Sequence, residues 1–191
     1  MAKVRDSGMP PAEQWEDYFD AAGIVETLCG TAVMGDAVEF GCGYGTFTIP
    51  CARRISGTLH AMDIDPQMVA STSARVARHR VQNARIEQRD FVSDGCGCES
   101  ESVSRALLFN ILHIENPVAL LKEAYRALRP GGSVAIVHWN YDADTPRGPP
   151  LDIRPRPDQC RAWAEEAGFA WGRNPPLPRS PWHWGMVMVR S

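Results

Sequence analysis

The sequence predicts an α/β fold, a doubly wound and mostly parallel sheet with helices on both of its faces. Strand-like apolar runs and amphipathic helix patterns alternate five times along the chain, as they do when parallel strands are joined by crossover helices. A glycine-rich turn follows the first of these strands. The chain then closes with a helix and two strands that are joined by a loop, so at least one of these two strands is expected to run antiparallel.

The bulk composition is that of a globular protein. The 191 residues are enough for one domain with a full core. They are 44% hydrophobic and carry a net charge of −3, without the basic excess of nucleic-acid binders. No apolar run approaches the ~20 residues of a membrane span, and the first ten residues lack a signal-peptide core. Six cysteines are too sparse for a disulfide scaffold, so we expect reduced thiols in a cytoplasmic protein.

Two helices are expected before the first strand. Trp15, Tyr18 and Phe19 are spaced i, i+3, i+4, which predicts an amphipathic helix from Pro11 onward. This helix either packs on the sheet or covers a ligand as a lid. A second short helix runs through residues 24–28 and ends at a glycine.

The first strand leads into the turn Gly41-Cys42-Gly43-Tyr44-Gly45. Glycines are needed where the backbone takes unusual dihedrals or approaches a ligand closely. A helix is expected from about Tyr44 to Arg53, with a kink or an early stop at Pro50, because proline removes a helical hydrogen bond.

The remaining elements follow from periodicity and capping signals. Asp65-Pro66 and Asn116-Pro117 each begin a helix, with the polar residue as N-cap and the proline in the first turn. The loop 140–157 is too long for a simple connection and is expected to be functional. Strands are predicted at 58–62, 84–88, 104–109, 133–139, 169–173 and 182–190, and a helix at 158–167.

Acidic residues follow the second and third strands, at the edge of the sheet where the glycine turn lies. Asp63 stands about 20 residues beyond the glycines, where an acid suits the two hydroxyls of a ribose. Asp90 follows the third strand. A nicotinamide dinucleotide would need the same acid, but its fingerprint is G-x-G-x-x-G. Thr46 stands where the third glycine would belong, which argues against a pyrophosphate.

Five segments, in order along most of the chain, resemble the motifs of the class I S-adenosylmethionine-dependent methyltransferases. They are Val38-Glu39-Phe40-Gly41-Cys42-Gly43-Tyr44-Gly45, Met62-Asp63-Ile64-Asp65-Pro66-Gln67-Met68, Arg89-Asp90-Phe91, Leu108-Phe109-Asn110-Ile111-Leu112-His113-Ile114 and Leu128-Arg129-Pro130-Gly131-Gly132. The resemblance implies a seven-stranded sheet whose last strand is antiparallel. It also implies a single methyltransferase domain over residues 1–191, with a helical lid segment (1–35), a cofactor-binding core (36–139) and a substrate side (140–191).

The resemblance implies S-adenosylmethionine as the cofactor and S-adenosylhomocysteine as the product. The glycine turn, including Cys42, would pass close to the methionine part, and Glu39 would order its ammonium group. Asp63 would accept from the ribose hydroxyls, and Ile64 would pack on the adenine. Asp90 and Phe91 would contact the adenine amino group and ring. The alternative for Glu39 is a turn-stabilising hydrogen bond, and the alternative for Asp90 is a turn residue.

The methyl-bearing side would be lined by Phe109 and Asn110. Because a sulfonium methyl is already activated, the enzyme supplies in-line alignment, and a base if the acceptor carries a proton. His183 is the preferred candidate base and His113 the second, with His138 also considered, although a histidine in an apolar strand is more often packed. The aromatic residues that are candidates for the acceptor pocket, with core packing as the alternative, are Trp15, Tyr18, Trp139 and Trp182.

Two further motifs are set aside. Asn174-Pro175-Pro176-Leu177 is similar to the Asn-Pro-Pro-aromatic motif of amino-directed methyltransferases, but it follows the sixth strand and lacks the aromatic residue. Cys96-Gly97-Cys98 is too small for a structural zinc site, which usually has four ligands, so no metal is expected.

The acceptor is expected to be a small molecule. The chain has no separate recognition domain and no basic groove, so neither nucleic acid nor a membrane is expected as a partner. The expected assembly is a monomer or a homodimer. Two alternatives stay open: a non-catalytic S-adenosylmethionine-binding module and, less favoured, a nicotinamide-dependent oxidoreductase.

Overall fold

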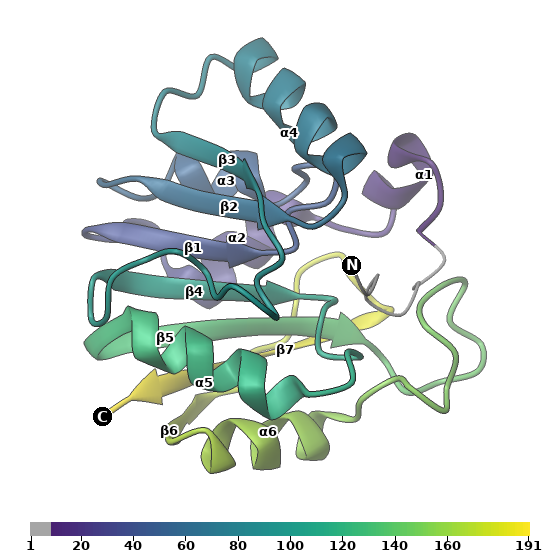
Figure 1. The fold of residues 1–191 in the computed structure, drawn as a ribbon. Coiled ribbons are helices and arrows are strands. Elements are labelled where there is room, and N and C mark those ends of the chain that lie inside the picture. Colours follow the sequence, from purple (N-terminus) through teal and green to yellow (C-terminus); the bar gives the residue numbers. More distant parts are fainter. Residues whose placement is uncertain (1–8) are drawn as a thin grey trace.

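The part of the chain described by the computed structural model, residues 9–191, folds as a seven-stranded sheet with helices on both faces (Figure 1). The strand order is β3-β2-β1-β4-β5-β7-β6. Strand β7 is antiparallel to both of its neighbours, and the pairs from β3 to β5 are parallel. The predicted fold class is confirmed.

The elements are α1 (Ala12–Glu16), α2 (Ala21–Cys29), β1 (Asp36–Phe40), α3 (Thr48–Ala52), β2 (Leu59–Asp63), α4 (Pro66–Arg78), β3 (Ala84–Gln88), β4 (Val103–Phe109), α5 (Pro117–Ala127), β5 (Leu128–Trp139), α6 (Pro157–Glu166), β6 (Phe169–Arg173) and β7 (His183–Arg190).

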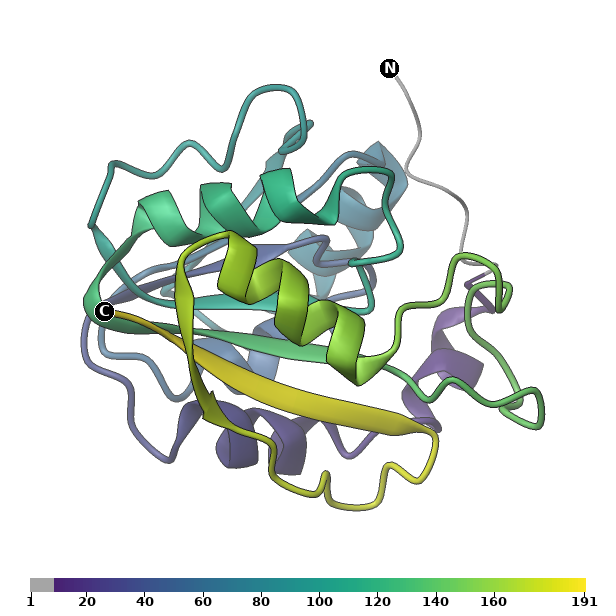
Figure 2. The same cartoon turned by 90° about the horizontal axis from the view of Figure 1, so that it is seen from below.

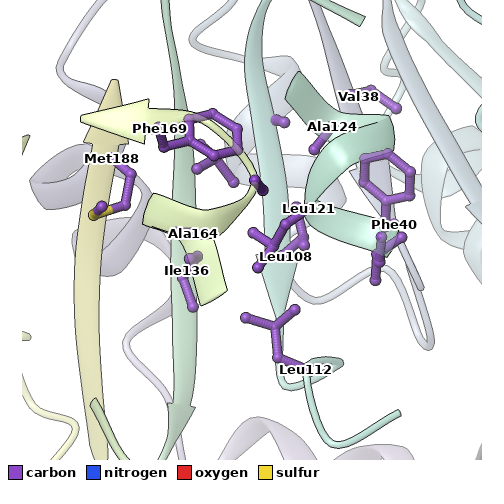
Figure 3. Packing of buried hydrophobic residues seen from close by; sticks show 14 of the residues in the cluster. Val38, Phe40, Leu108, Leu112, Leu121, Ala124, Ile136, Ala164, Phe169 and Met188 are labelled. Carbon is purple, nitrogen blue, oxygen red and sulfur yellow. The ribbon is translucent and has the colours of Figure 1, made fainter. Parts of the chain in front are cut away.

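Helices α5 and α6 cover one face of the sheet, and α2 lies on the opposite face (Figure 2). The core under α5 and α6 joins Leu121 and Ala124 of α5 and Ala164 of α6 to Leu108 and Ile136 of the strands (Figure 3). Each large apolar side chain buried there contributes about 1.5–3 kcal/mol relative to an exposed one. This packing holds β4 and β5 in place, and their carboxyl ends carry part of the site.

The second core lies on the other face. Ala135 and Val137 alternate with Ile136 along β5 and therefore point away from α5 and toward α2. Helix α2 contributes Ile24 and Leu28, both fully buried. Because β5 is packed on both faces, its central residues read as one continuous apolar run, as is typical of parallel strands.

The helix starts predicted from capping signals are confirmed. The Asp65 carboxylate accepts a hydrogen bond from the Gln67 N–H at 2.8 Å, with Pro66 opening α4. Asn116 accepts from the Ala119 N–H at 3.0 Å at the start of α5. Each cap satisfies one of the amide groups that a helix N-terminus leaves without a partner.

Two helices differ from the sequence expectation. Helix α1 covers only Ala12–Glu16, so Tyr18 and Phe19 lie beyond its end. Helix α3 begins at Thr48 rather than near Tyr44, because the glycine turn continues with backbone dihedrals that a right-handed helix cannot use. Pro50 therefore falls in the first helical turn, where the amide N–H has no helical partner to lose, and no kink is needed.

Strand β5 begins at Leu128, earlier than the predicted start at residue 133. Leu128 pairs with Val103, and after a shift in register Ser133 pairs with Arg105. The residues between them bulge from the ladder. Within residues 9–191, no helix has both the length and the apolar character to cross a membrane.

Candidate functional site

The glycine turn lies at the carboxyl ends of the parallel strands, at the same end of the sheet as α1 and the loop that follows β5 (Figure 1). The N–H groups of Gly41 and Cys42 both donate to the Met62 carbonyl at 2.9 Å, which ties the turn to the end of β2. Gly41, Gly43 and Gly45 have φ values of +73°, +52° and +76°. These values lie in the left-handed region that side chains other than glycine rarely adopt.

Neighbouring side chains crowd the turn. A Cβ atom at Gly41 would lie 3.3 Å from Ile111, and one at Gly45 would lie 3.1 Å from Thr72. The Thr72 hydroxyl also donates to the Gly43 carbonyl at 2.7 Å, joining the turn to α4. The turn is therefore held in one shape, and its residues from Gly41 to Tyr44 line an adjoining hollow.

Asp63 is positioned by the turn that it faces. Its carboxylate accepts from the Gly43 N–H at 2.9 Å and from the Asp65 N–H at 3.0 Å. Burial raises the pKa of this carboxyl, and the two backbone hydrogen bonds oppose the rise. A carboxylate offers about four acceptor positions. With two of them occupied, Asp63 retains capacity for hydroxyl groups of a ligand.

The hollow beside the turn, which we call the glycine pocket, has a volume of about 300 Å³. That is the lower end of the range of about 300–1,000 Å³ for small-molecule sites. Its walls come from the ends of β1, β2 and β4 and from α1. The lining residues are Met9, Trp15, Gly41, Cys42, Gly43, Tyr44, Thr46, Phe47, Asp63, Ile64, Asp65, Met68, Phe91, Phe109, Asn110, Ile111 and His113.

Glu39 lies behind the pocket and does not line it. Only 2% of its surface is exposed, and Thr48 donates a hydroxyl hydrogen bond to it at 2.7 Å. Burial raises the pKa of Glu39 to about 8; the hydrogen bond from Thr48 opposes this rise, and the charge of Asp63 adds to it. The carboxyl is therefore protonated at neutral pH when the pocket holds no cation.

The two residues after β3 have different surroundings. The Asp90 carboxylate accepts from the N–H groups of Val92 and Ser93, both at 3.2 Å, and from the Ser93 hydroxyl at 3.1 Å. It thus holds its own turn together and is not among the lining residues. Phe91 does line the pocket and packs edge-on against Phe40, with ring centroids 5.6 Å apart.

Asn110 is the most unusual polar residue in the pocket wall. Its φ is +55°, and its backbone N–H donates to the Val137 carbonyl at 2.8 Å. The oxygen and the nitrogen of its side-chain amide are both buried, and neither has a hydrogen-bond partner within residues 9–191. A buried polar group without a partner costs about 1–3 kcal/mol, so this amide is suited to pair with a ligand.

The histidines separate into two groups. His113 lines the glycine pocket. His183 does not; its ring lies between Phe19 and Trp139, at centroid distances of 4.3 and 4.1 Å. Burial lowers the pKa of His183 to about 3, with a contribution from Arg154. His138 is fully buried, which lowers its pKa well below the usual value.

The tryptophans and the tyrosine of the expected acceptor pocket do not all meet there. Trp15 lines the glycine pocket. Trp139 is only 1% exposed and belongs to the buried interior, with Tyr18 packed edge-on against it at 5.4 Å. Trp182 is partly buried and is not a lining residue of the glycine pocket.

A second hollow of about 290 Å³ lies beside the loop that joins β5 to α6, and we call it the loop hollow. His113 lines it as well as the glycine pocket. The lining residues are Leu112, His113, Ile114, Glu115, Pro117, Tyr141, Leu151, Asp152, Ile153, Arg154, Pro155, Arg156, Gln159 and Trp163.

The loop beside this hollow is folded around Arg154, which sequence reasoning missed. Its side chain is only 7% exposed although it carries a full charge. The guanidinium donates to four backbone carbonyls and one hydroxyl, which belong to Pro149, Asn140, Asp142, Arg147 and Thr145. Arg156 adds a cation–π contact over the Tyr141 ring at 3.9 Å. An arginine in a polar loop shows no spacing that distinguishes it from a solvated one, so no sequence signal was available.

Known proteins resemble this chain in both sequence and fold. A protein-family model described as a methyltransferase domain matches residues 37–132. The ribosomal protein L11 methyltransferase of Methylococcus capsulatus is 35% identical over 121 residues, which are 63% of this chain and 36% of that protein. The ubiquinone biosynthesis O-methyltransferase of Parvibaculum lavamentivorans is 27% identical over 104 residues, or 54% of this chain and 40% of that protein. The matched part thus spans roughly a third to two fifths of these relatives.

Among solved structures, a methyltransferase from Aquifex aeolicus described as S-adenosylmethionine-dependent superposes with a TM-score of 0.81. The sequence identity is 18%, and the match covers 95% of this chain and 94% of the other. At this identity the likeness concerns the fold, and it extends over almost the whole chain.

Proposed function

The chain belongs to the class I S-adenosylmethionine-dependent methyltransferases, and from this premise we propose that it transfers a methyl group in-line from that cofactor to a small-molecule acceptor. The observation that supports the proposal best is the position of His113, which borders both the glycine pocket and the loop hollow. A methyl donor in one hollow and a methyl acceptor in the other would both lie beside this side chain.

The residues of the glycine pocket fit the cofactor of this family. The glycine turn lines the pocket without bulky side chains at Gly41 and Gly43, Asp63 keeps acceptor capacity for ribose hydroxyls, and the buried Asn110 amide has polar atoms without a partner in the described residues. Phe91 and Ile64 supply apolar walls for an adenine ring. When bound there, the cofactor supplies an activated sulfonium methyl group, and the protein contributes alignment.

The loop hollow suits a small acceptor. Its volume of about 290 Å³ is close to the lower end of the range for small-molecule sites. Asp152 and Arg156 provide both signs of charge, and Trp163 an aromatic wall. The relatives named above include an O-methyltransferase named for ubiquinone biosynthesis and a methyltransferase named for a ribosomal protein, so the test below includes both small-molecule and protein acceptors.

His113 is the proposed proton acceptor for a protonated nucleophile, because it is the candidate histidine that lines both hollows. His183, the candidate preferred from the sequence, is less suited to the role. Its pKa near 3 makes it a weak base, and its ring is enclosed by Phe19 and Trp139. Efficient general bases have pKa values close to the working pH.

The first experiment is calorimetric titration with S-adenosylhomocysteine, with a nicotinamide dinucleotide as the control ligand. Asp63→Asn should lower the affinity for S-adenosylhomocysteine by ten- to a hundredfold, because a hydrogen bond to a charged acceptor contributes about 1.5–3 kcal/mol. Asp20→Asn is the matched control. Asp20 caps α2 and is not among the residues that line the pocket, and asparagine is an equally good N-cap.

Unchanged affinity of Asp63→Asn for S-adenosylhomocysteine would contradict the proposed position of the ribose. Binding of the dinucleotide alone would contradict the proposed identity of the cofactor.

Turnover is tested by following S-adenosylhomocysteine formation across a panel of small hydroxyl, amine and thiol acceptors. Tight cofactor binding without product across the panel, but methylation of a protein substrate, would refute the small-molecule part. No turnover with any acceptor would favour a binding module.

A further inference from the structure

Cys96 and Cys98 lie in the loop that precedes β4 and are not lining residues of the glycine pocket. Gly95 and Gly97 have φ values of +64° and +72°, so the chain bends around the pair. Cys96 is only 2% exposed, whereas Cys98 is partly exposed and lines an open hollow beside α5. One thiol can thus be reached from solvent, and the other lies beneath it.

Arg126 of α5 brings a positive charge to the pair. Its Nη2 atom donates to the Cys98 carbonyl at 2.7 Å and lies 3.7 Å from the Cys96 sulfur. The same guanidinium binds the Glu123 carboxylate at 2.8 Å through both Nε and Nη2. Glu123 in turn accepts from the Cys96 N–H at 2.8 Å. The loop is therefore held against α5 by charged hydrogen bonds.

The pKa values of the two thiols are shifted in opposite directions. Hydrogen bonding from the Cys96 thiol lowers the pKa of Cys98; partial burial opposes this effect, and the Arg126 charge adds to it. The pKa of Cys96 is raised, first by the same hydrogen bond and then by burial. By contrast, burial raises the pKa of Cys29 to about 11. A partly exposed thiol of lowered pKa beside a second thiol is the environment in which cysteines are oxidised selectively.

We propose that Cys98 and Cys96 form an oxidation site, in which a hydroperoxide oxidises Cys98 to a sulfenic acid and Cys96 then closes a disulfide with it. In the first step the Cys98 thiolate attacks the terminal peroxide oxygen, so that an S–O bond forms and the O–O bond breaks. The departing alkoxide, or hydroxide when the oxidant is hydrogen peroxide, takes a proton from solvent and leaves as an alcohol or as water. The sulfur is oxidised and the peroxide is reduced.

In the second step the Cys96 thiol loses its proton and attacks the sulfenic sulfur of Cys98. The S–S bond forms, and the hydroxyl group leaves with a proton as water. The reach is sufficient, because two residues of extended chain span at most about 7 Å and a disulfide accepts Cα atoms up to about 6.8 Å apart. The bend at Gly97 brings the two ends closer than an extended chain would.

The test treats the full chain with hydrogen peroxide, blocks the remaining thiols with iodoacetamide and digests the protein with trypsin. The peptide 90–105 contains Cys96 and Cys98 and no other cysteine, and it is bounded by arginines. We expect this peptide to lose the mass of two hydrogens, and dithiothreitol to reverse the loss. In Cys96→Ser, the Cys98 sulfenic acid should persist and react with dimedone.

Cys98→Ser should slow the oxidation of Cys96 by at least about tenfold, and Cys160→Ser, a fully buried control, should change nothing. If Cys98→Ser loses thiols as fast as the parent, the assignment is wrong. A measurement on the parent alone guards against variants that fail to fold: native Cys98 should react with iodoacetamide at least about tenfold faster than Cys29. Equal rates would also overturn the proposal.

Discussion

Glu39→Gln is expected to remove much of the dependence of the unfolding free energy on pH between about 4.5 and 8. Glu39 is buried behind the glycine turn, where its pKa is raised from 4.5 to about 8. In the unfolded chain the same carboxyl ionises near 4.5. Between these values the folded protein holds a proton that the unfolded chain has released, so the folded state becomes less favourable as the pH rises.

The size of this effect on the unfolding free energy follows from the pKa shift of Glu39. Each pKa unit corresponds to about 1.4 kcal/mol, so a rise from 4.5 to about 8 amounts to about 5 kcal/mol for this group. The contribution of neutral Glu39 is fully present below pH 4.5 and is lost as the pH passes through about 8. Glutamine keeps the size of the side chain and an oxygen that accepts from the Thr48 hydroxyl, but it does not titrate.

The assay is urea unfolding of the parent and of Glu39→Gln at intervals from pH 4.5 to 8.5. The unfolding free energy of the variant relative to the parent should rise across this range by several kcal/mol. Glu26→Gln is the matched control, since Glu26 forms an exposed ion pair with Arg54 that contributes at most about 1 kcal/mol. Parallel curves for the parent and Glu39→Gln would refute the burial of a protonated carboxyl.

Three further substitutions test the site. Gly43→Ala should destabilise the protein by about 1–2 kcal/mol, because alanine at a φ of +52° is strained, and it should weaken S-adenosylhomocysteine binding in calorimetry by moving the N–H that Asp63 accepts from. His113→Asn should lower kcat by about 10²–10⁴ with a smaller change in cofactor affinity, as measured in single-turnover assays with a proton-bearing acceptor. His183→Phe should retain turnover. In urea unfolding its free energy should fall less than that of the parent between pH 7 and 5, because the stability that neutral His183 contributes is present above pH 6.5 and is lost as the pH falls toward about 3.

Features set by a few neighbouring residues could be predicted from the sequence. Asp65 and Asn116 cap their helices as expected, because a cap requires only the right side chain two or three residues before an amide. The parallel order of the early strands follows from the crossover helices between them. The loop between β6 and β7 predicts that these two strands run in opposite directions, as they do, whereas the direction of β7 relative to β5 is implied by the family resemblance.

The start of α3 and the directions of the site side chains depend on contacts between distant parts of the chain. Helix α3 starts at Thr48 because the glycine turn continues through Gly45, whose φ is +76°, and this turn is bound to Asp63, twenty residues further along the chain. The sequence favours His183 over His113 as the base, but it does not show which of the two side chains faces a ligand pocket. In the fold, His183 is covered by Phe19, a residue from the other end of the chain. The sequence likewise does not show whether the Asp90 carboxylate faces a ligand or its own turn, because that depends on the direction of the side chain. In the fold the carboxylate bonds its own turn.

The loop around Arg154 has a consequence for how this protein can change over evolutionary time. Four of the five groups that the guanidinium holds are backbone carbonyls, and every residue type carries one. Apart from Arg154 itself and Thr145, whose hydroxyl accepts the fifth bond, side chains along this loop can therefore be exchanged without removing these bonds. Gly148 is a further exception, because a Cβ there would collide with Trp139 and Arg154. The side chains that line the loop hollow, the proposed acceptor site, can therefore diverge among descendants of this protein while the backbone of the loop keeps its shape.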